Sequence, residues 1–310
     1  MSHPRAVALM VLVTLLWSIA GVVSRHFDSV GGFEVVFWRS LFTALALSIA
    51  LTIIRGPGLW RGLLRAPWQL WFSGVCWSVM MTAFMLAITL TTVANVLICM
   101  ALAPLITALF ARALLQHRLP SRTWAAIVMA GVGIAWMFGQ EAAKGVSLSG
   151  TLVAMAVPLA AALNFTMLQH VGHGRSDAGA AVRQDMLPTV LIGAVLSAAF
   201  TLPLAYPFQA SVHDLGLLAM LGCVQLALPC LLVVRLTREL PAPEIALLGL
   251  LEVLFGIAWA WLGAGETPDR STLVGGTLVL GALIANETLA LLSARARRLP
   301  KKLPTTSGAP

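Results

Sequence analysis

The sequence has very few charged residues: Asp, Glu, Lys and Arg make up only 10% of its 310 residues. Soluble proteins average roughly 25%, so this chain cannot cover a globule of its size with polar side chains. Apolar residues make up 59% and recur in long runs from end to end, which excludes a soluble domain on a single anchor. We therefore expect an integral membrane protein.

Cysteine is also scarce, and the four cysteines fall inside apolar runs at spacings that match no metal motif. The six histidines lie at the ends of those runs or outside them, and the His170/His173 pair has no Cys or carboxylate cluster beside it. A Walker A sequence is missing, which argues against direct use of ATP. We expect no metal, no cofactor and no catalytic residue.

A helix needs about 20 apolar residues to cross the hydrocarbon core. The uncharged segment 66–111 would be about twice the bilayer thickness as one helix, so it must turn, most simply near 89–92. The predicted spans are 6–24, 34–54, 68–90, 93–116, 122–139, 148–170, 182–205, 212–234, 243–263 and 271–293.

The basic residues follow these predicted spans. With a cytoplasmic N-terminus, nearly all Lys and Arg fall in inner segments, and only Arg25, Lys144 and Arg270 fall in outer ones. This asymmetry predicts that both termini are cytoplasmic. It also explains the net charge of +8 by topology, with anionic lipid headgroups rather than nucleic acid as the partner.

The two halves of the sequence repeat one plan. Segments 94–136 and 242–285 both read as a long apolar helix, a turn that contains Pro, and a Gly-rich helix. Five spans per copy is an odd number, so the second copy enters the membrane inverted, as in many secondary transporters. We predict an all-α integral membrane protein of ten transmembrane helices, built as two inverted five-helix repeats around a central cavity. The repeats are 1–140 and 145–293, and a basic tail, 294–310, is expected to be disordered.

Several short motifs are shared with a known family. They are Leu15 to Ser18, Phe37 to Ser40, the 87–94 turn that leads into Ala103 to Leu105, and Gly265-Glu266. With them the chain resembles the EamA-type ten-span transporters of the drug/metabolite transporter superfamily, most of all the aromatic amino acid exporter branch. The resemblance implies that spans 1–4 and 6–9 surround a cavity and that the substrate is an amino acid or another small metabolite. The first-span Glu of the small multidrug-resistance relatives is absent, which disfavours drug or cation efflux.

Polar groups at membrane depth are the candidate site residues. The carboxyl of Glu252, in the middle of its span, is a candidate ligand for a proton or a substrate ammonium, and the alternative is a structural hydrogen bond. Amides, hydroxyls and indoles near the midplane suit a zwitterion, although polar groups also join helices in lipid. The candidate substrate-binding residues are Trp17, Ser18, Trp77, Ser78, Asn95, Asn164, Gln225 and Glu252.

Other residues at depth have structural interpretations. We interpret Arg39 as snorkelling or pairing with Glu34, and Glu244 as an acid favoured in the first turn of its helix. Trp60, Trp68 and Trp71 at span ends are interpreted as interface anchors. Three prolines within the predicted spans can kink their helices: Pro104, Pro158 and Pro229. They are candidate hinges for gating, and the alternative is that the kinks only curve the wall of the cavity.

The leading hypothesis is a secondary transporter in a bacterial inner membrane that exports amino acids, aromatic ones included, or related metabolites by alternating access. Its expected partners are a small-molecule substrate and the lipid bilayer, with a monomer as one option. An intramembrane enzyme would need convergent catalytic groups at depth, and a channel would need a polar pore through the whole thickness. The sequence leaves proton coupling and facilitated diffusion both open.

Overall fold

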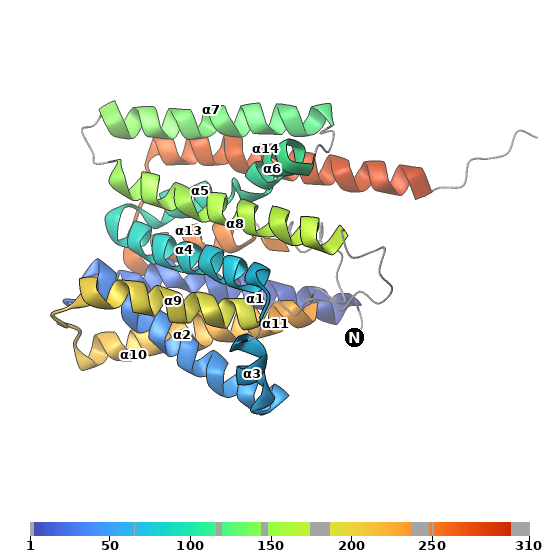
Figure 1. Cartoon of the computed structure of the whole chain (residues 1–310). Coiled ribbons are helices and arrows are strands. Elements are labelled where there is room, and N and C mark those ends of the chain that lie inside the picture. Colours follow the sequence, from blue (N-terminus) through green and yellow to red (C-terminus); the bar gives the residue numbers. More distant parts are fainter. Residues whose placement is uncertain are drawn as a thin grey trace, which may run out of the picture.

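The computed structural model describes residues 3–64, 66–115, 120–143, 148–173, 187–236, 248–249 and 251–298. In these ranges the regular structure is helical throughout. Figure 1 shows the helices lying side by side, most of them aligned along one direction. The all-helical class predicted from the sequence is confirmed for this part of the chain.

The first half of the chain contributes seven of the described helices: α1 (His3–Ser24), α2 (Gly32–Arg55), α3 (Gly58–Leu64), α4 (Trp68–Leu90), α5 (Val93–Met100), α6 (Ala103–Leu115) and α7 (Ser121–Ala143). The second half contributes α8 (Ser149–His173), α9 (Leu187–Ala205), α10 (Val212–Met220), the π-helical segment η1 (Leu221–Ala227), α11 (Leu228–Leu236), α13 (Leu251–Ala264) and α14 (Arg270–Arg298).

Six stretches of the described residues are helical, long and apolar enough to cross a bilayer. They are Pro4–Ser24, Gly32–Arg55, Trp68–Leu90, Val93–Phe110, Pro188–Ala205 and Val212–Val233. Two shorter apolar helices, Ser149–Asn164 and Leu251–Ala264, lie within other predicted spans. The multi-pass membrane character is therefore confirmed, and the count of ten spans stays a prediction.

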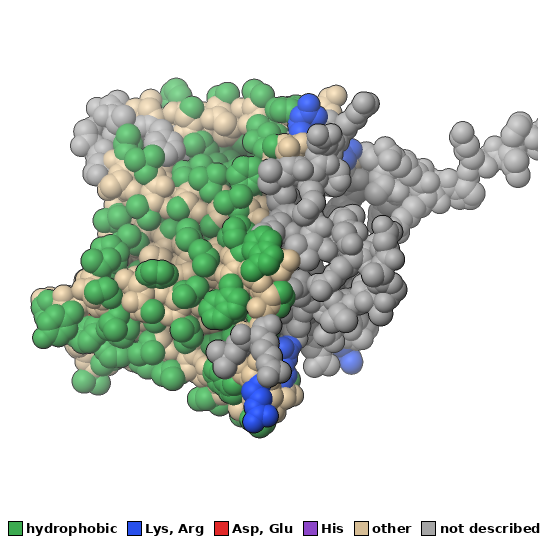
Figure 2. All heavy atoms as spheres, in the orientation of Figure 1, with side chains coloured by type: hydrophobic (Ala, Val, Ile, Leu, Met, Phe, Trp, Pro, Cys, Tyr) green, Lys and Arg blue, Asp and Glu red, His purple; other side chains and the backbone are tan. Residues whose placement is uncertain are grey.

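The outer surface of the bundle is apolar. Figure 2 shows hydrophobic side chains over most of the face in view, with Lys and Arg gathered at the end where α3 lies. Ile53, Val128 and Phe200 are exposed by 77%, 64% and 69%. Because a soluble protein rarely exposes so continuous an apolar surface, these sides of the bundle are the lipid-facing ones.

The predicted span 93–116 is interrupted in the structure. Helix α5 ends at Met100 and α6 begins at Ala103, with a turn at Ala101 and Leu102. Pro104 is therefore the second residue of a helix, a position where its missing N–H leaves no intrahelical bond unmade. The sequence placed this proline inside one continuous span, and the structure places it at a helix boundary.

The predicted span 212–234 is continuous but changes its winding. Residues Leu221–Ala227 are π-helical, and the Leu228 N–H donates to the carbonyl of Cys223. Pro229 follows directly, and its ring would clash with the carbonyl four residues earlier in a regular α-helix. The wider π turn removes that clash, so the proline explains where the irregular segment lies.

Packing places five elements in the interior of the bundle. Helix α1 packs against α11 and α13, α2 against α9 and η1, and α4 against α8 and α9. Helices α7 and α14 pack along each other at one edge, as Figure 1 shows. Helix α1 also contacts α4 and η1, and α2 contacts α4, so the interior lies between α1, α2, α4 and η1, with α13 packed against α1.

Candidate functional site

A chain of polar contacts crosses this interior. Arg39 on α2 is only 2% exposed, and its Nη2 donates to Oε1 of Gln225 at 2.9 Å. Gln225 is also 2% exposed, and its Nε2 donates to the backbone carbonyl of Trp17 at 2.9 Å. The contacts link α1, α2 and η1. We call Trp17, Arg39, Gln225 and Glu252 the central group.

The backbone of η1 brings Gln225 to Arg39 because Gly222 has no side chain. A Cβ at Gly222 would lie 2.8 Å from the Arg39 carbonyl oxygen and 2.7 Å from the Phe42 Cβ. The Thr43 hydroxyl donates to the Gly222 carbonyl at 3.2 Å across the same contact. The site is thus built on a close approach of two backbones, next to a π turn of the kind often found at functional sites.

The electrostatics of the central group are unusual for a membrane interior. The Nε of Arg39 is buried and has no hydrogen-bond partner among the described residues, and the guanidinium carbon lies 5.8 Å from the centre of the Phe84 ring. Glu252, the second residue of α13, attracts Arg39 electrostatically, but the two form no ion pair within 4 Å. A cation and a carboxyl therefore share the interior without direct contact.

The expectation that Arg39 snorkels or pairs with Glu34 is wrong. Glu34 instead accepts hydrogen bonds from the backbone N–H groups of Gln209 and Ala210 at 3.0 and 2.9 Å, and from Trp38 Nε1 at 3.3 Å. It fixes the connection between α9 and α10. With Glu34 engaged there, the Arg39 side chain turns inward to Gln225.

The two indoles selected from the sequence are partly buried, and one selected amide, Asn164, is fully buried. Trp17 and Trp77 pack against one apolar cluster that includes Leu47 and Leu191. Among the residues that the structure describes, the buried Trp77 Nε1 has no hydrogen-bond partner, and neither do the two polar atoms of the Asn164 amide.

The positions of the candidate hydroxyls and prolines do not indicate a binding role. Ser18 donates to the Leu15 carbonyl of its own helix at 2.7 Å, and Ser78 is buried. Pro158 is buried inside α8, and Pro229 is buried next to the π turn. Glu244 lies outside the described residues.

Asn95 lies away from the central group, near the turn between α4 and α5. Its Nδ2 donates to Thr151 Oγ1 on α8 at 2.6 Å and to Thr91 Oγ1 at 3.2 Å. The structure therefore does not bring Asn95 together with Trp17, Gln225 and Glu252.

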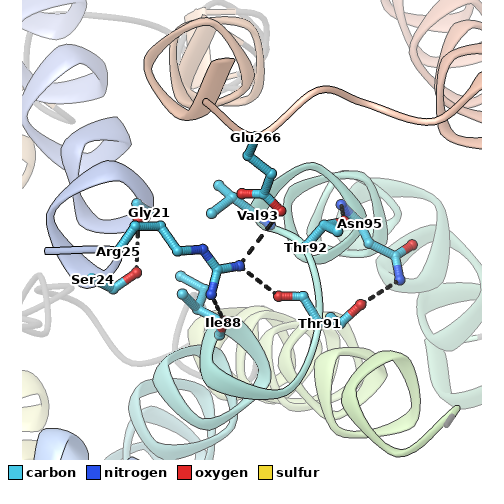
Figure 3. Close-up of polar contacts among 9 residues, drawn as sticks. All are labelled: Gly21, Ser24, Arg25, Ile88, Thr91, Thr92, Val93, Asn95 and Glu266. Carbon is cyan, nitrogen blue, oxygen red and sulfur yellow. Dashed lines mark hydrogen bonds and ion pairs between the residues drawn. The ribbon is translucent and has the colours of Figure 1, made fainter. Parts of the chain in front are cut away.

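A second polar network closes one end of the bundle (Figure 3). Arg25, just beyond α1, donates to the backbone carbonyls of Ile88 and Thr91 at 2.9 and 2.7 Å. Glu266 accepts from the Val93 N–H at 3.0 Å and lies 3.5 Å from Arg25 Nη2. The end of α1, the α4–α5 turn and the α13–α14 connection are thus joined. We call this network the outer latch, after the outer location that the sequence predicts for Arg25.

Gly265 positions Glu266 in the outer latch. Its φ of +65° lies in the left-handed region, which favours glycine. The turn brings the Glu266 N–H to the Ala260 carbonyl at 3.0 Å and ends α13. The sequence had marked Gly265-Glu266 as a motif, but Arg25 was counted only as an outer charge.

Two hollows on the surface lie elsewhere. One, of about 220 Å³, is lined by residues around Glu34 and Tyr206, and the other, of about 260 Å³, by α9 with Trp60 and Trp71. The second is wholly apolar in its lining and faces the lipid side of the bundle. Neither hollow is lined by the central group.

Known proteins resemble this chain over most of its length. The model of the EamA-like transporter family matches residues 4–139 and again residues 148–286. The Pseudopaline exporter CntI of Pseudomonas aeruginosa, in two strains, is 22% identical over 283 residues, which cover 90% of this chain and 94% of that protein. One crystal structure aligns with a TM-score of 0.61 and 19% identity, over 96% of this chain and 100% of the other, a likeness of fold.

Proposed function

Because this chain belongs to the EamA-like transporter family, we propose that it is a secondary transporter that exports amino acids, aromatic ones included, or related small metabolites by alternating access. The similarity to a protein named as a metabolite exporter supports export of a small molecule. We place it in the inner membrane of a bacterium. The basic end of the bundle, where α3 lies, is then the cytoplasmic one, together with both termini.

The observation that carries this proposal is a symmetry in the helix packing. Let α1, α2, α4, α5/α6 and α7 correspond in order to α8, α9, α10/η1/α11, α13 and α14. The α4–α8 contact then becomes α1–α11, α4–α9 becomes α2–η1, and α1–α13 becomes α6–α8, all of which occur. The α7–α14, α2–α9 and α5–α13 contacts map onto themselves.

We propose that the pattern arises from two inverted five-helix repeats, with units at 1–140 and 145–293; an odd number of spans in each unit inverts the second one. The family model, which matches the two halves separately, supports the same division. A pseudo-two-fold axis in the membrane plane gives the molecule two related conformations, each open to one side. Alternating access is therefore the mechanism that this architecture favours over a channel or an intramembrane enzyme.

The outer latch supports a state that is closed to the outside. It joins α1 and the α4–α5 turn of the first half to Glu266 of the second half. In the proposed cycle, these contacts break when the site opens outward. The hinges that accompany this motion are assigned to Pro104, Pro158 and Pro229, where helices are interrupted or lack a backbone bond.

The proposed substrate site is the interior around the central group. Trp17 and Trp77 supply apolar contact, Gln225, Asn164, Ser18 and Ser78 supply polar contact, and Glu252 binds the substrate ammonium or a coupling proton. Asn95 would contact substrate only near the outer end of the path, beside the latch.

Reconstitution of the full chain in liposomes tests the proposal. Uptake of a panel of labelled amino acids and amines is measured with and without a pH gradient, with protein-free liposomes as the control. We expect saturable uptake of at least one amino acid. A pH gradient that changes the rate assigns proton coupling, and an unchanged rate assigns facilitated diffusion. No uptake of any compound in the panel would overturn the proposed function.

A further inference from the structure

We infer that Arg39 binds the carboxylate of the transported substrate, which displaces the side chain of Gln225 from the guanidinium. This inference rests on the proposed function and narrows its substrate class. Substrates would be amino acids or other carboxylates with a second, cationic group, rather than simple amines. The sequence had given Arg39 only a structural role.

The first support is that the guanidinium has few partners for its burial. Arginine carries five N–H donors. Among the described residues, Gln225 is the one hydrogen-bond acceptor of Arg39, while Nε is buried with no partner. Within the described part of the chain, no carboxylate lies within 4 Å of the guanidinium to neutralise it. A buried cation in this condition is costly to the fold, so its presence is better explained by an anion that arrives during transport.

The second support is the nature of the partner that Arg39 has. Gln225 offers a neutral amide oxygen, and its Nε2 is held by the Trp17 carbonyl. A carboxylate accepts two parallel N–H bonds from a guanidinium and binds it more strongly than a neutral amide does. Gln225 therefore holds Arg39 in place in the empty site, and a substrate carboxylate can exchange with it.

The third support is the position of Glu252. Its carboxyl feels the charge of Arg39 but stays beyond ion-pair distance. A zwitterion placed between them would present its carboxylate to Arg39 and its ammonium to Glu252. The Phe84 ring, 5.8 Å from the guanidinium carbon, and the Trp17 indole offer apolar contact next to the charged groups. An α-amino acid carries both charges and can present one to each of these groups.

A purely structural reading competes with this one. Polar contacts between helices in lipid stabilise their packing modestly, and the Arg39–Gln225 bond joins α2 to η1. If the contact is purely structural, a permanent ion pair at the same place would maintain or raise the stability of the protein and leave transport intact. If Arg39 binds the substrate, the permanent ion pair would block transport, because the guanidinium would no longer be free to bind a substrate carboxylate.

The experiment uses the full chain in liposomes. The probes are L-phenylalanine and L-leucine, each compared with its amide and with its decarboxylated amine. The variants are Arg39→Lys, which keeps the charge but loses the planar fork, and Gln225→Glu, which gives Arg39 a permanent carboxylate. Arg61→Gln, on the exposed helix α3, is the matched control. Unfolding temperatures in detergent are recorded for every variant.

For the wild type, we expect uptake of the free amino acids and little competition from amides or amines. Arg39→Lys should raise KM about tenfold or more, the loss expected for hydrogen bonds to a charged group. Gln225→Glu should abolish uptake while its unfolding temperature stays the same or rises, and Arg61→Gln should behave as wild type.

Two results would overturn the inference and leave the proposed function standing. One is wild-type transport of the amines as fast as of the amino acids, and the other is normal amino acid uptake by Gln225→Glu. If the wild type moves none of the compounds, the proposed function and the inference both fail. If Arg39→Lys does not fold, Gln225→Glu still decides, because it keeps Arg39.

Discussion

Arg39 on α2 and Gln225 in the π-helical segment, 186 positions apart in the chain, are joined by a 2.9 Å hydrogen bond inside the bundle. Each residue is 2% exposed, so water does not compete for this contact. Its length depends on how closely the backbones of α2 and η1 approach. Gly222 sets that approach, which makes it the residue through which the site geometry can be changed without touching a polar group.

We predict that Gly222→Ala destabilises the protein and weakens transport. The new Cβ would lie 2.7 Å from the Phe42 Cβ and 2.8 Å from the Arg39 carbonyl oxygen, which forces η1 away from α2. Overpacking of this kind costs about 1–3 kcal/mol. The unfolding temperature in detergent and the initial rate of uptake in liposomes should both fall.

Gly216→Ala is the matched control for this substitution. Gly216 lies in α10 of the same predicted span, and a Cβ there meets nothing within 4 Å. Replacing a helical glycine with alanine favours the helix by up to about 1 kcal/mol, so stability should hold or rise. Equal stability of the Gly222 and Gly216 variants would contradict the role given to the close approach.

The positions of many helices could be predicted from the sequence because each membrane span requires about 20 mostly apolar residues in a row, which is a strong signal. The predicted segments 6–24, 34–54 and 68–90 coincide with α1, α2 and α4, and the turn expected near 89–92 lies at Thr91 and Thr92. The break at Ala101 and Leu102 and the π turn before Pro229 were not predicted. A proline shows that a helix is disturbed near it, but neighbouring helices decide which form the disturbance takes.

The same limit applies to the candidate site. Trp17, Gln225 and Glu252 were selected because polar and indole groups at depth stand out in an apolar sequence. Arg39 was misjudged because its Cα lies about 10 Å along the helix from the start of α2, near enough to the outer end for snorkelling. Only the tertiary structure shows that Glu34 is already bonded to the backbone of Gln209 and Ala210, which leaves Arg39 to turn inward.

Glu252→Gln should slow the export of free amino acids by about tenfold, the loss expected when a charge-assisted hydrogen bond to the substrate ammonium becomes a neutral one. N-acetylated amino acids lack the ammonium, so any residual uptake of these compounds should be the same in the variant and the wild type. Any response of the wild-type rate to a pH gradient should disappear. Unchanged uptake and pH response in the variant would remove Glu252 from the site.

Opening of the outer latch should be favoured when Glu266 is changed to Gln. The pair with Arg25 is partly exposed, with side-chain exposures of 30% and 17%, so its contribution is modest, about 1 kcal/mol or less. A change of that size shifts a two-state equilibrium about fivefold. We expect the population open to the outside to rise by up to that factor.

Thiol labelling measures this shift. Ser18→Cys is made in a background without the four native cysteines and is reacted from outside with a membrane-impermeant thiol reagent. The labelling rate should rise in Glu266→Gln. Asp28→Asn, which breaks the exposed contact between Asp28 and His213 on the α2 and α10 side, is the control and should leave the rate unchanged. Equal rates with and without Glu266 would show that the latch does not control outward opening.

Trp77→Phe separates a substrate role from a packing role. The buried Trp77 Nε1 has no partner among the described residues, so replacing the indole removes no such hydrogen bond from the apo protein. The smaller ring loses some packing against the apolar cluster, so the unfolding temperature should fall only modestly. If a substrate accepts from that N–H, KM should increase about fivefold, the effect of one neutral hydrogen bond. Trp71→Phe, at an exposed position on the same helix, controls for the loss of an indole from α4. A rise in KM only for the Trp77 variant, with no more than that modest fall in unfolding temperature, would assign the indole to the substrate. A fall in stability with unchanged KM would instead show that Trp77 has a packing role and does not contact the substrate.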